Sequence, residues 1–334
     1  MFKNRTFYAL FVLTLAVTFV LAACGNNNNT GAAGDASPAP TTAPTAAPTD
    51  ESATGEVEMI TFTAGNGDVE VPKNPQRIVD LTAFYTGYFV ALEAPLVGAL
   101  DGALQNPYLN GKVDGVENLG SEPTPEKILA LNPDLIIAYV GTEGLESLAE
   151  IAPVVAVQYG KLNYKDQMVD FGKLTNKEAE AKAWVENWES KINELKPQVQ
   201  EAVGDKTVSI LNPYSKGLYV FGHNYGRGGE IIYGEFGLKA PAAAQKEAID
   251  SGTGWASISL EVLPTYAGDI IFTCPWSGDT SDPKVVYDNA LWSSLPAVKA
   301  GNVFQLNPAA DTYNDPVSLE AQLDFITTSL LSVK

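Results

Sequence analysis

Residues 125–139 read PEKILALNPDLIIAY, a helix-like segment followed at once by an apolar run. Asp134 leads directly into that run, Leu135–Ala138, which has the length and composition of a buried strand. The stretch therefore predicts one helix–strand unit, the building block of an α/β fold.

The same pattern recurs as LEVLPTYAGDIIFT at 260–273. When Glu126 is aligned with Glu261, Asp134 falls on Asp269, and each aspartate enters an apolar strand. Strands expected near residues 78 and 210 precede the two copies by similar intervals. The repeat favours two lobes of like topology, although two generic helix–strand units would also match this well.

In the segment before the first copy, strand patterns alternate with helix patterns, which is typical of a mainly parallel sheet. Residues 57–72 alternate apolar and polar positions around Gly-Asn-Gly-Asp, which predicts a β-hairpin. NPQRIVDL at 74–81 and APLVGAL at 94–100 are expected strands, and the helical pattern at 84–92 lies between them. Strands that alternate with helices indicate an α/β lobe.

Between the lobes, residues 174–203 predict one long helix. Apolar residues recur with helical spacing from Ala181 to Leu195, and Thr175 and Glu178 have the spacing of a capping box. Pro197 is expected to end or kink this helix. The fold class expected is α/β, with two similar lobes of mainly parallel sheet joined by one long, rigid α-helix.

The first 56 residues have the composition of a leader and a tether. Residues 1–23 carry two basic residues and an apolar run, as a secretory signal does, and LAAC at 21–24 resembles a bacterial lipobox. Cys24 is then the lipidated residue; a cleaved signal with a chance cysteine, or an uncleaved anchor, remains the alternative. Residues 24–56, rich in Asn, Ala, Thr and Pro, predict a disordered tether.

The domain boundaries expected are 57–163 for the first lobe, 164–203 for the connecting helical segment and 204–334 for the second lobe. A hydrophobic content of 45% and 18% charged residues are typical of a globular protein. The formal net charge of −19 argues against nucleic acid and anionic membranes as partners of this body. With Cys24 lipidated, Cys274 has no partner for a disulfide.

The stretch FGHNYGRGGE at 221–230 places Arg227 between glycines. It lacks the Gly-Lys-Ser/Thr of a phosphate-binding loop, and Ile231 stands where a dinucleotide fingerprint requires glycine. Gly228 to Glu230 instead lead into an apolar helical pattern that Gly237 ends. The stretch predicts a helix N-terminus, whose free N–H groups and dipole are joined by the Arg227 charge.

The lipobox, the tether, VPKNPQRIVDL, PEKILALNPDLII, the connecting helix, GRGGEIIYGEFGLKAP and TYNDPVSLEAQLD occur here in order. From Val57 to the C-terminus the chain thus resembles the ferric-siderophore substrate-binding lipoproteins of ABC importers, the helical-backbone group of periplasmic-type binding proteins. The resemblance implies a ligand cleft between the lobes and delivery of an iron–siderophore complex to a permease. It also implies anchorage on the outer face of the bacterial plasma membrane.

In such a protein the siderophore saturates the iron, so the cleft supplies donors and apolar surface rather than metal ligands. The resemblance places Arg227 and Tyr225 in the cleft. The other candidates follow or flank expected strands, and core packing is the alternative for each tyrosine. They are Tyr219, Phe84, Tyr85, Tyr139, Trp276 and Tyr313. With Arg227 as the one cleft cation identified, hydroxamate complexes of low charge are expected over highly anionic catecholates, unless Lys161 and Lys165 face the cleft.

Other functions fit the sequence less well. The chain has one histidine, His223, which cannot build a multi-histidine metal site. The same shortage argues against a haem held by histidine. Cobalamin is the alternative ligand within this fold. An enzyme is not expected, because the chain has no Gly-x-Ser-x-Gly motif and nothing positions His223 in a triad. A purely structural lipoprotein is also disfavoured, because it would not need two lobes with an arginine in the cleft between them.

Glu126 and Glu261 match by motif the glutamates that pair with permease arginines in the family. The alternative is that both are first-turn acids favoured by the helix dipole. Their equivalent places in the two lobes favour docking to an ABC permease dimer. The protein is expected to be a monomer with no cofactor of its own.

Overall fold

A computed structural model describes residues 57–276, 280 and 282–334. The predicted signal peptide, Cys24 and the tether lie outside these residues. None of the helices in the described part of the chain has the length and apolar character needed to cross a bilayer.

The first lobe is built on a five-stranded, fully parallel sheet, in the order β5-β4-β3-β6-β7. Its strands are β3 (Ile78–Asp80), β4 (Leu96–Ala99), β5 (Glu117–Asn118), β6 (Leu135–Tyr139) and β7 (Val154–Val157). Its helices are α1 (Thr86–Ala91), α2 (Asp101–Leu104), η1 (Pro107–Leu109), α3 (Pro125–Ala130) and α4 (Leu145–Ala149). The predicted hairpin is confirmed as the antiparallel pair β1 (Met59–Ala64) and β2 (Gly67–Pro72).

The second lobe has a mixed sheet in the order β10-β9-β8-β11-β12, in which β8, β11 and β12 are parallel and β9 and β10 are antiparallel. Its strands are β8 (Val208–Tyr214), β9 (Gly217–Phe221), β10 (Trp255–Ile258), β11 (Ile270–Thr273) and β12 (Val303–Gln305). Its helices are η2 (Glu230–Glu235), α7 (Ala242–Ala244), η3 (Gln245–Ile249), η4 (Leu260–Val262), α8 (Leu263–Tyr266), α9 (Lys284–Tyr287), α10 (Ala290–Ser294) and α11 (Pro296–Ala300).

The helix–strand repeat has the same structural role in both lobes. In each lobe, the strand after the aspartate pairs in parallel with the first strand of the five-stranded sheet, β6 with β3 and β11 with β8. Asp134 accepts hydrogen bonds from the backbone N–H groups of Gln76 (2.6 Å) and Arg77 (2.8 Å). Asp269 accepts one from the N–H of Thr207 (2.8 Å). Each aspartate therefore secures the residues that lead into the neighbouring strand.

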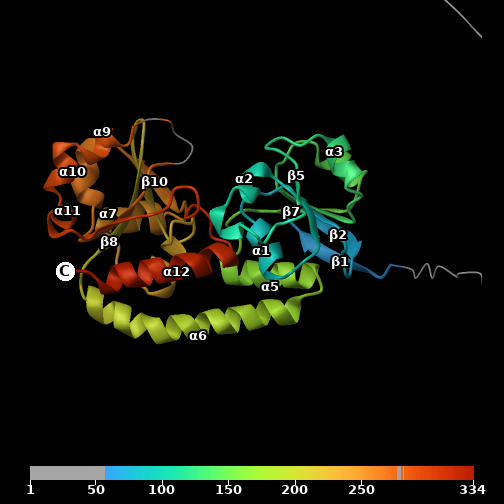
Figure 1. Cartoon of the computed structure of the whole chain (residues 1–334), viewed down its shortest axis with the longest axis horizontal. Helices are drawn as coiled ribbons and strands as arrows, with labels where there is room; N and C mark the ends of the chain where they lie inside the picture. The colour runs from blue at the N-terminus through green and yellow to red at the C-terminus, as the bar shows by residue number, and fades with distance from the viewer. Residues whose placement is uncertain (1–56, 277–279, 281) are drawn as a thin grey trace, which may run out of the picture. The chain divides into compact units, whose positions relative to one another are not determined.

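The predicted long helix is confirmed as α6 (Glu178–Val203), which at 26 residues spans about 39 Å. Figure 1 shows α6 running beside α5 (Tyr164–Leu174) and the C-terminal helix α12 (Pro316–Leu331), and both pack against it. Pro197 lies inside α6 and does not end it, so of the two predicted effects, an end or a kink, the end is wrong and the kink stays a prediction.

The predicted capping box at the start of this helix is also wrong. Thr175 lies at the end of α5, where its hydroxyl donates to the carbonyl oxygen of Phe171 (2.8 Å). Lys177 stands at the N-cap of α6 and makes no side-chain capping bond. The sequence pattern did not reveal that one helix ends and another begins here, because Thr175 makes its hydrogen bond within the preceding helix, α5.

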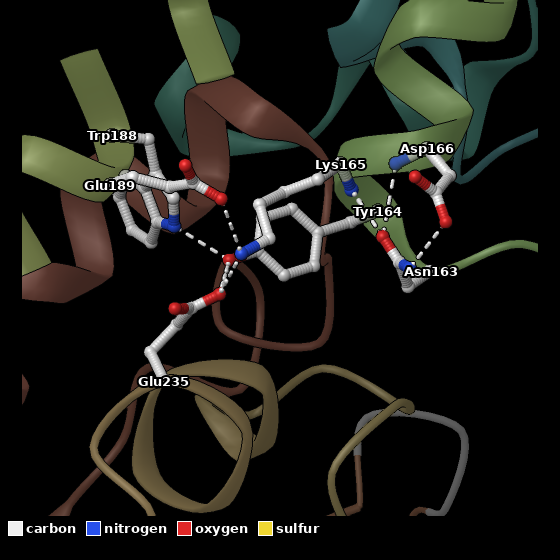
Figure 2. A network of polar contacts seen from close by, with 7 residues as sticks. All are labelled: Asn163, Tyr164, Lys165, Asp166, Trp188, Glu189 and Glu235. Carbon is white, nitrogen blue, oxygen red and sulfur yellow. Dashed lines mark hydrogen bonds and ion pairs between the residues drawn. The ribbon is translucent and has the colours of Figure 1, made fainter. Parts of the chain in front are cut away.

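A polar junction network joins α5, α6 and η2 (Figure 2). The indole N–H of Trp188 donates to the hydroxyl of Tyr164 (2.6 Å), which in turn donates to Glu235. Lys165 Nζ lies 3.1 Å from Glu189 Oε1 and 3.2 Å from Glu235 Oε1. Since Glu235 belongs to the second lobe, the network ties that lobe to both helices.

Candidate functional site

An aromatic cavity of about 430 Å³ lies between the two lobes. The first lobe lines it with three side chains that follow or end parallel strands, where α/β folds open their clefts. The second lobe contributes residues of β9 and β10, of the loop that carries Arg227, and of the segments that follow β11 and β12. The lining residues are Phe84, Tyr139, Tyr159, Tyr219, Phe221, Tyr225, Arg227, Trp255, Trp276 and Thr312.

Strand geometry explains the aromatic wall of the second lobe. Tyr219 and Phe221 are two residues apart on β9 and therefore share one face of the sheet. Trp255 on β10 pairs directly with Phe221, and its ring contacts Tyr219 at a centroid distance of 5.5 Å. Trp276 follows β11 and stacks on Phe221 at 6.1 Å and 14°. Three rings from β9 and β10 and the ring of Trp276, which follows β11, thus form one apolar surface.

Arg227 lies against this wall and is only 4% exposed. Its guanidinium carbon is 4.0 Å from the ring centre of Phe221 and 4.9 Å from that of Trp276, distances at which a cation is attracted to a ring face. Its Nη1 and Nη2 donate to the Tyr225 carbonyl (2.5 Å) and the Thr312 hydroxyl (2.8 Å). Burial lowers the pKa of the guanidinium to about 10, so it remains charged at neutral pH.

The guanidinium has donor capacity that these two bonds do not use. Arg227 Nε has no hydrogen-bond partner. Among the residues that the structure describes, Arg227 is the only charged side chain that lines the aromatic cavity. Burial raises the pKa values of Tyr139 and Tyr159 well above the ordinary tyrosine value, so both hydroxyls stay neutral. The cavity combines a large apolar surface with one cation and neutral polar groups.

The loop that carries Arg227 is the predicted helix N-terminus, although η2 is a π-helix rather than an α-helix. Gly229 is its N-cap, and Gly237 follows it with φ of 66°, consistent with the predicted stop. The residue before the cap, Gly228, adopts φ of 76°.

Six of the eight predicted ligand residues line the aromatic cavity: Arg227, Tyr225, Tyr219, Phe84, Tyr139 and Trp276. Tyr85 and Tyr313 do not line it. Tyr85 is 4% exposed and packs behind Tyr139 with ring centres 5.7 Å apart. Tyr313 packs on Phe84 at 5.5 Å, and its hydroxyl donates to the Gly102 carbonyl (2.5 Å).

Four lining residues were not predicted: Tyr159, Phe221, Trp255 and Thr312. Tyr159 follows β7, so the strand-end rule that selected Tyr139 also applies to it. Lys161 and Lys165 do not line the cavity, and Lys165 is paired in the junction network.

No group of histidine, cysteine, aspartate and glutamate side chains suited to a metal ion occurs among the residues described. Cys274 is buried and free, and burial raises the pKa of its thiol to about 11. His223 lies outside the lining of the aromatic cavity.

Glu126 and Glu261 have matching surroundings on the two lobes. Each lies in the first turn of a helix and is fully exposed. The pKa of Glu126 is lowered by its own backbone N–H and the Thr124 hydroxyl. The pKa of Glu261 is lowered by the Ser259 hydroxyl and its own N–H. Both side chains are therefore ionised and accessible.

Comparison with known proteins gives one consistent result. Residues 78–310 match the family described as periplasmic binding protein. The iron(3+)-hydroxamate-binding protein FhuD of Bacillus subtilis (strain 168) is 42% identical over 330 residues, which cover 98% of this chain and 97% of that protein.

Two solved structures extend the similarity. An FhuD fold-family protein of Bacillus subtilis, described as the periplasmic binding component of a Fep/Fec-like ferrichrome ABC transporter, matches with a TM-score of 0.76 and 44% identity over 81% of this chain and 100% of that chain. FhuD2 of Staphylococcus aureus with bound ferrioxamine B matches with a TM-score of 0.71 and 32% identity, over 77% and 98% of the respective chains.

Proposed function

Because this chain belongs to the periplasmic binding protein family, we propose that it captures a ferric siderophore of the hydroxamate class and delivers it to an ABC importer. The names of two relatives, which match 98% and 81% of this chain, support this ligand class. They give no support to cobalamin or haem, the alternatives that the sequence left open.

The aromatic cavity is the observation that carries the proposal. A ferric hydroxamate has its iron coordination filled by the siderophore, carries little net charge and presents an organic shell. A cavity with ten lining residues and a single cation, Arg227, suits that surface. A highly anionic complex would need several cations, since each uncompensated charge loses its hydration on burial. The protein needs no resident cofactor, because iron arrives inside the ligand.

Six residues are proposed to contact the ligand directly: Arg227, Tyr225, Tyr219, Phe84, Tyr139 and Trp276. Arg227 donates hydrogen bonds to the oxygens around the iron, and the rings cover the organic shell. Tyr85 and Tyr313, which pack behind Tyr139 and Phe84, are proposed to hold the first-lobe wall in position.

The protein is proposed to work outside the cytoplasm as a monomeric lipoprotein. Residues 1–23 are the signal, Cys24 carries the lipid anchor and residues 24–56 form the tether. Residues 57–163 and 204–334 form the lobes, and 164–203 connect them. Glu126 and Glu261 pair with the permease dimer, a role supported by their matching exposed positions. We propose binding and delivery, with no catalytic step.

Tryptophan fluorescence tests the ligand class, because Trp255 and Trp276 line the cavity. We expect saturable quenching by a ferric hydroxamate, with weaker or no quenching by ferric catecholate, cobalamin and haem. Replacing Trp276 by Phe should remove part of the quenching, while Trp188→Phe, in the junction network, should leave it in place. Absence of saturable quenching by any ferric hydroxamate would sink the proposal.

A further inference from the structure

A second cavity, also of about 430 Å³, lies between the lobes and differs in chemistry from the aromatic one. We call it the polar cavity. Tyr88, Tyr159 and Gln167 line it from the first lobe and α5, and His223, Glu230 and Asn314 line it from the second lobe. Tyr159 lines both cavities and therefore forms part of the wall between them.

Three deeply buried polar side chains of this cavity have unsatisfied atoms. Glu230, Asn314 and Gln167 are 3%, 9% and 2% exposed. Glu230 Oε2, Asn314 Oδ1 and Gln167 Nε2 have no hydrogen-bond partner. Since nearly all buried polar groups in proteins are paired, such a concentration indicates an occupant that supplies the missing partners.

The hydrogen bonds already made fix the kind of partner required. Glu230 Oε1 accepts from the Gly226 N–H (3.1 Å) and from Asn314 Nδ2 (2.8 Å). Because Asn314 uses its amino group in this bond, its free Oδ1 is an acceptor, as is Glu230 Oε2. Two neighbouring side chains thus offer acceptor oxygens, and they need a donor.

The charges around the cavity favour a cationic donor. Lys165 also lines it, but its ammonium pairs with Glu189 and Glu235, as Figure 2 shows. Glu230 has no ion-pair partner within 4.0 Å among the residues described. Burial raises the pKa of Glu230 although its hydrogen bonds and the Arg227 charge act to lower it, so the ionised carboxylate is not fully compensated until a further cation approaches.

We propose that the polar cavity binds a primary ammonium group, which donates to Glu230 Oε2 and Asn314 Oδ1. A protonated amine has three donors and a positive charge, and the tyrosine rings of the wall offer it further favourable surface. A metal ion fits less well, because no cluster of metal-ligating side chains occurs among the described residues. This site is separate from the aromatic cavity and does not rest on the proposed ferric ligand.

Calorimetric titration with n-butylammonium chloride tests the proposal, with 1-butanol as the uncharged probe of the same length. We expect saturable binding of butylammonium to the full chain, at least tenfold tighter than that of butanol. Equal binding of both probes, or no saturable binding of butylammonium, would overturn the proposal.

Two variants locate the site. Glu230→Gln keeps the oxygen that accepts from Gly226 and Asn314 but replaces the free oxygen by a donor, and should weaken butylammonium at least tenfold. Gly234→Leu fills the cavity, because Gly234 lines it and a Cβ there meets no atom within 4 Å. It should abolish binding even if Glu230→Gln fails to fold. Asp324→Asn, an exposed charge removal, is the control and should change nothing. Unchanged binding in Gly234→Leu would contradict the assignment.

Competition separates the two sources of the ammonium group, the ferric ligand and a free amine. If the ferric ligand carries it, ferrioxamine B, which has a primary amine, should displace butylammonium, whereas its N-acetyl derivative should not. If a free amine is the ligand, neither complex should displace it. Quenching of Gly234→Leu by the N-acetyl derivative, measured in parallel, reports on the aromatic cavity alone, so the failure of either site is recognised separately.

Discussion

Arg227 adopts φ of 58°, a left-handed conformation that is uncommon outside glycine. Its neighbours Gly226 and Gly228 adopt φ of 72° and 76°. A Cβ at Gly226 would overlap the Thr312 carbonyl, so glycine is required for close backbone approach as well. The N–H of Arg227 donates to the Asp311 carbonyl (2.5 Å), which holds the strained residue in place. The glycines on either side of Arg227 thus allow the backbone conformation that places its guanidinium against the aromatic wall.

Replacing Arg227 by Ala should weaken the ferric hydroxamate by about 1.5–3 kcal/mol, the range for a charge-assisted hydrogen bond. Arg227→Lys keeps the charge but loses the planar fork that lies over Phe221, so it should recover only part of the affinity. Fluorescence titration measures both variants, and circular dichroism melting confirms that they are folded. A folded Arg227→Ala protein with native affinity would remove the arginine from the binding site.

At the level of elements, the sequence predicted those features whose causes are local. The helix–strand repeat was found because Asp134 and Asp269 each stand directly before an apolar run, at the same spacing from a glutamate. The missed residues depend on distant partners. Trp255 joins the cavity wall only because β10 pairs with β9, and a sequence does not show which strands will be neighbours. Thr175 was misassigned because a hydroxyl can serve either of two adjoining helices.

Pro197 lies on an exposed face inside α6 and provides no N–H to the helix. Pro197→Ala should raise the free energy of unfolding by about 2–2.6 kcal/mol, the helix gain less the greater entropy of the unfolded chain. Urea denaturation followed by circular dichroism measures this change. Glu201→Ala, an exposed site on the same helix, is the control and should stay within about 0.5 kcal/mol of wild type. A loss of stability in Pro197→Ala would mean that α6 needs a bend there.

Asp80 ends β3 and is fully buried. It accepts hydrogen bonds from the Thr82 N–H (2.8 Å) and from the hydroxyls of Thr82 and Thr86 (2.6 Å each). Burial nevertheless dominates and raises the pKa of Asp80 from 3.8 to about 7. Because the folded state then holds this proton more tightly than the unfolded state, the contribution of Asp80 to stability falls as the pH rises from about 4 through 7.

In the Asp80→Asn variant the side chain at position 80 cannot titrate. The stability of this variant should therefore lack the decrease with pH that Asp80 contributes in the wild type. Unfolding free energies of both proteins at pH 5 and pH 8 give the comparison. We expect the wild type to lose more stability than Asp80→Asn between the two values. Equal losses would show that Asp80 is ionised in the folded protein at both pH values.

At the scale of the molecule, several contacts besides the cavities hold the lobes together. Tyr108 donates to Asp311 Oδ1 (2.6 Å), and Asn106 donates to the hydroxyl of Ser318 (2.9 Å). With α6 as a continuous connection, these bonds favour small lobe movements on binding. Small-angle X-ray scattering should therefore give the same radius of gyration with and without ferric hydroxamate. A clear decrease on binding would indicate a hinge closure that these contacts do not allow for.

The proposed docking uses both lobes at once, because Glu126 and Glu261 each lie in the first turn of a helix, one in each lobe. Reversing both charges, with Glu126→Lys and Glu261→Lys, should abolish uptake of ⁵⁵Fe-labelled ferric hydroxamate by cells. Each single reversal should reduce uptake partially, since exposed ion pairs are individually weak. Affinity of the purified double variant for the ferric complex should be unchanged, because neither residue lines the aromatic cavity.

The matched control reverses two other exposed acids, one on each lobe, with Glu150→Lys and Asp324→Lys. This control variant has the same change in net charge as the Glu126→Lys, Glu261→Lys variant. If its uptake is normal, the loss of uptake in the latter is caused by the positions of Glu126 and Glu261 and not by the overall electrostatic field of an acidic protein. Equal defects in the two double variants would instead point to that general field. Because salt screens exposed charges, the impairment that a single reversal causes relative to wild type should be largest at low ionic strength, where the lost attraction and the new repulsion are both strongest.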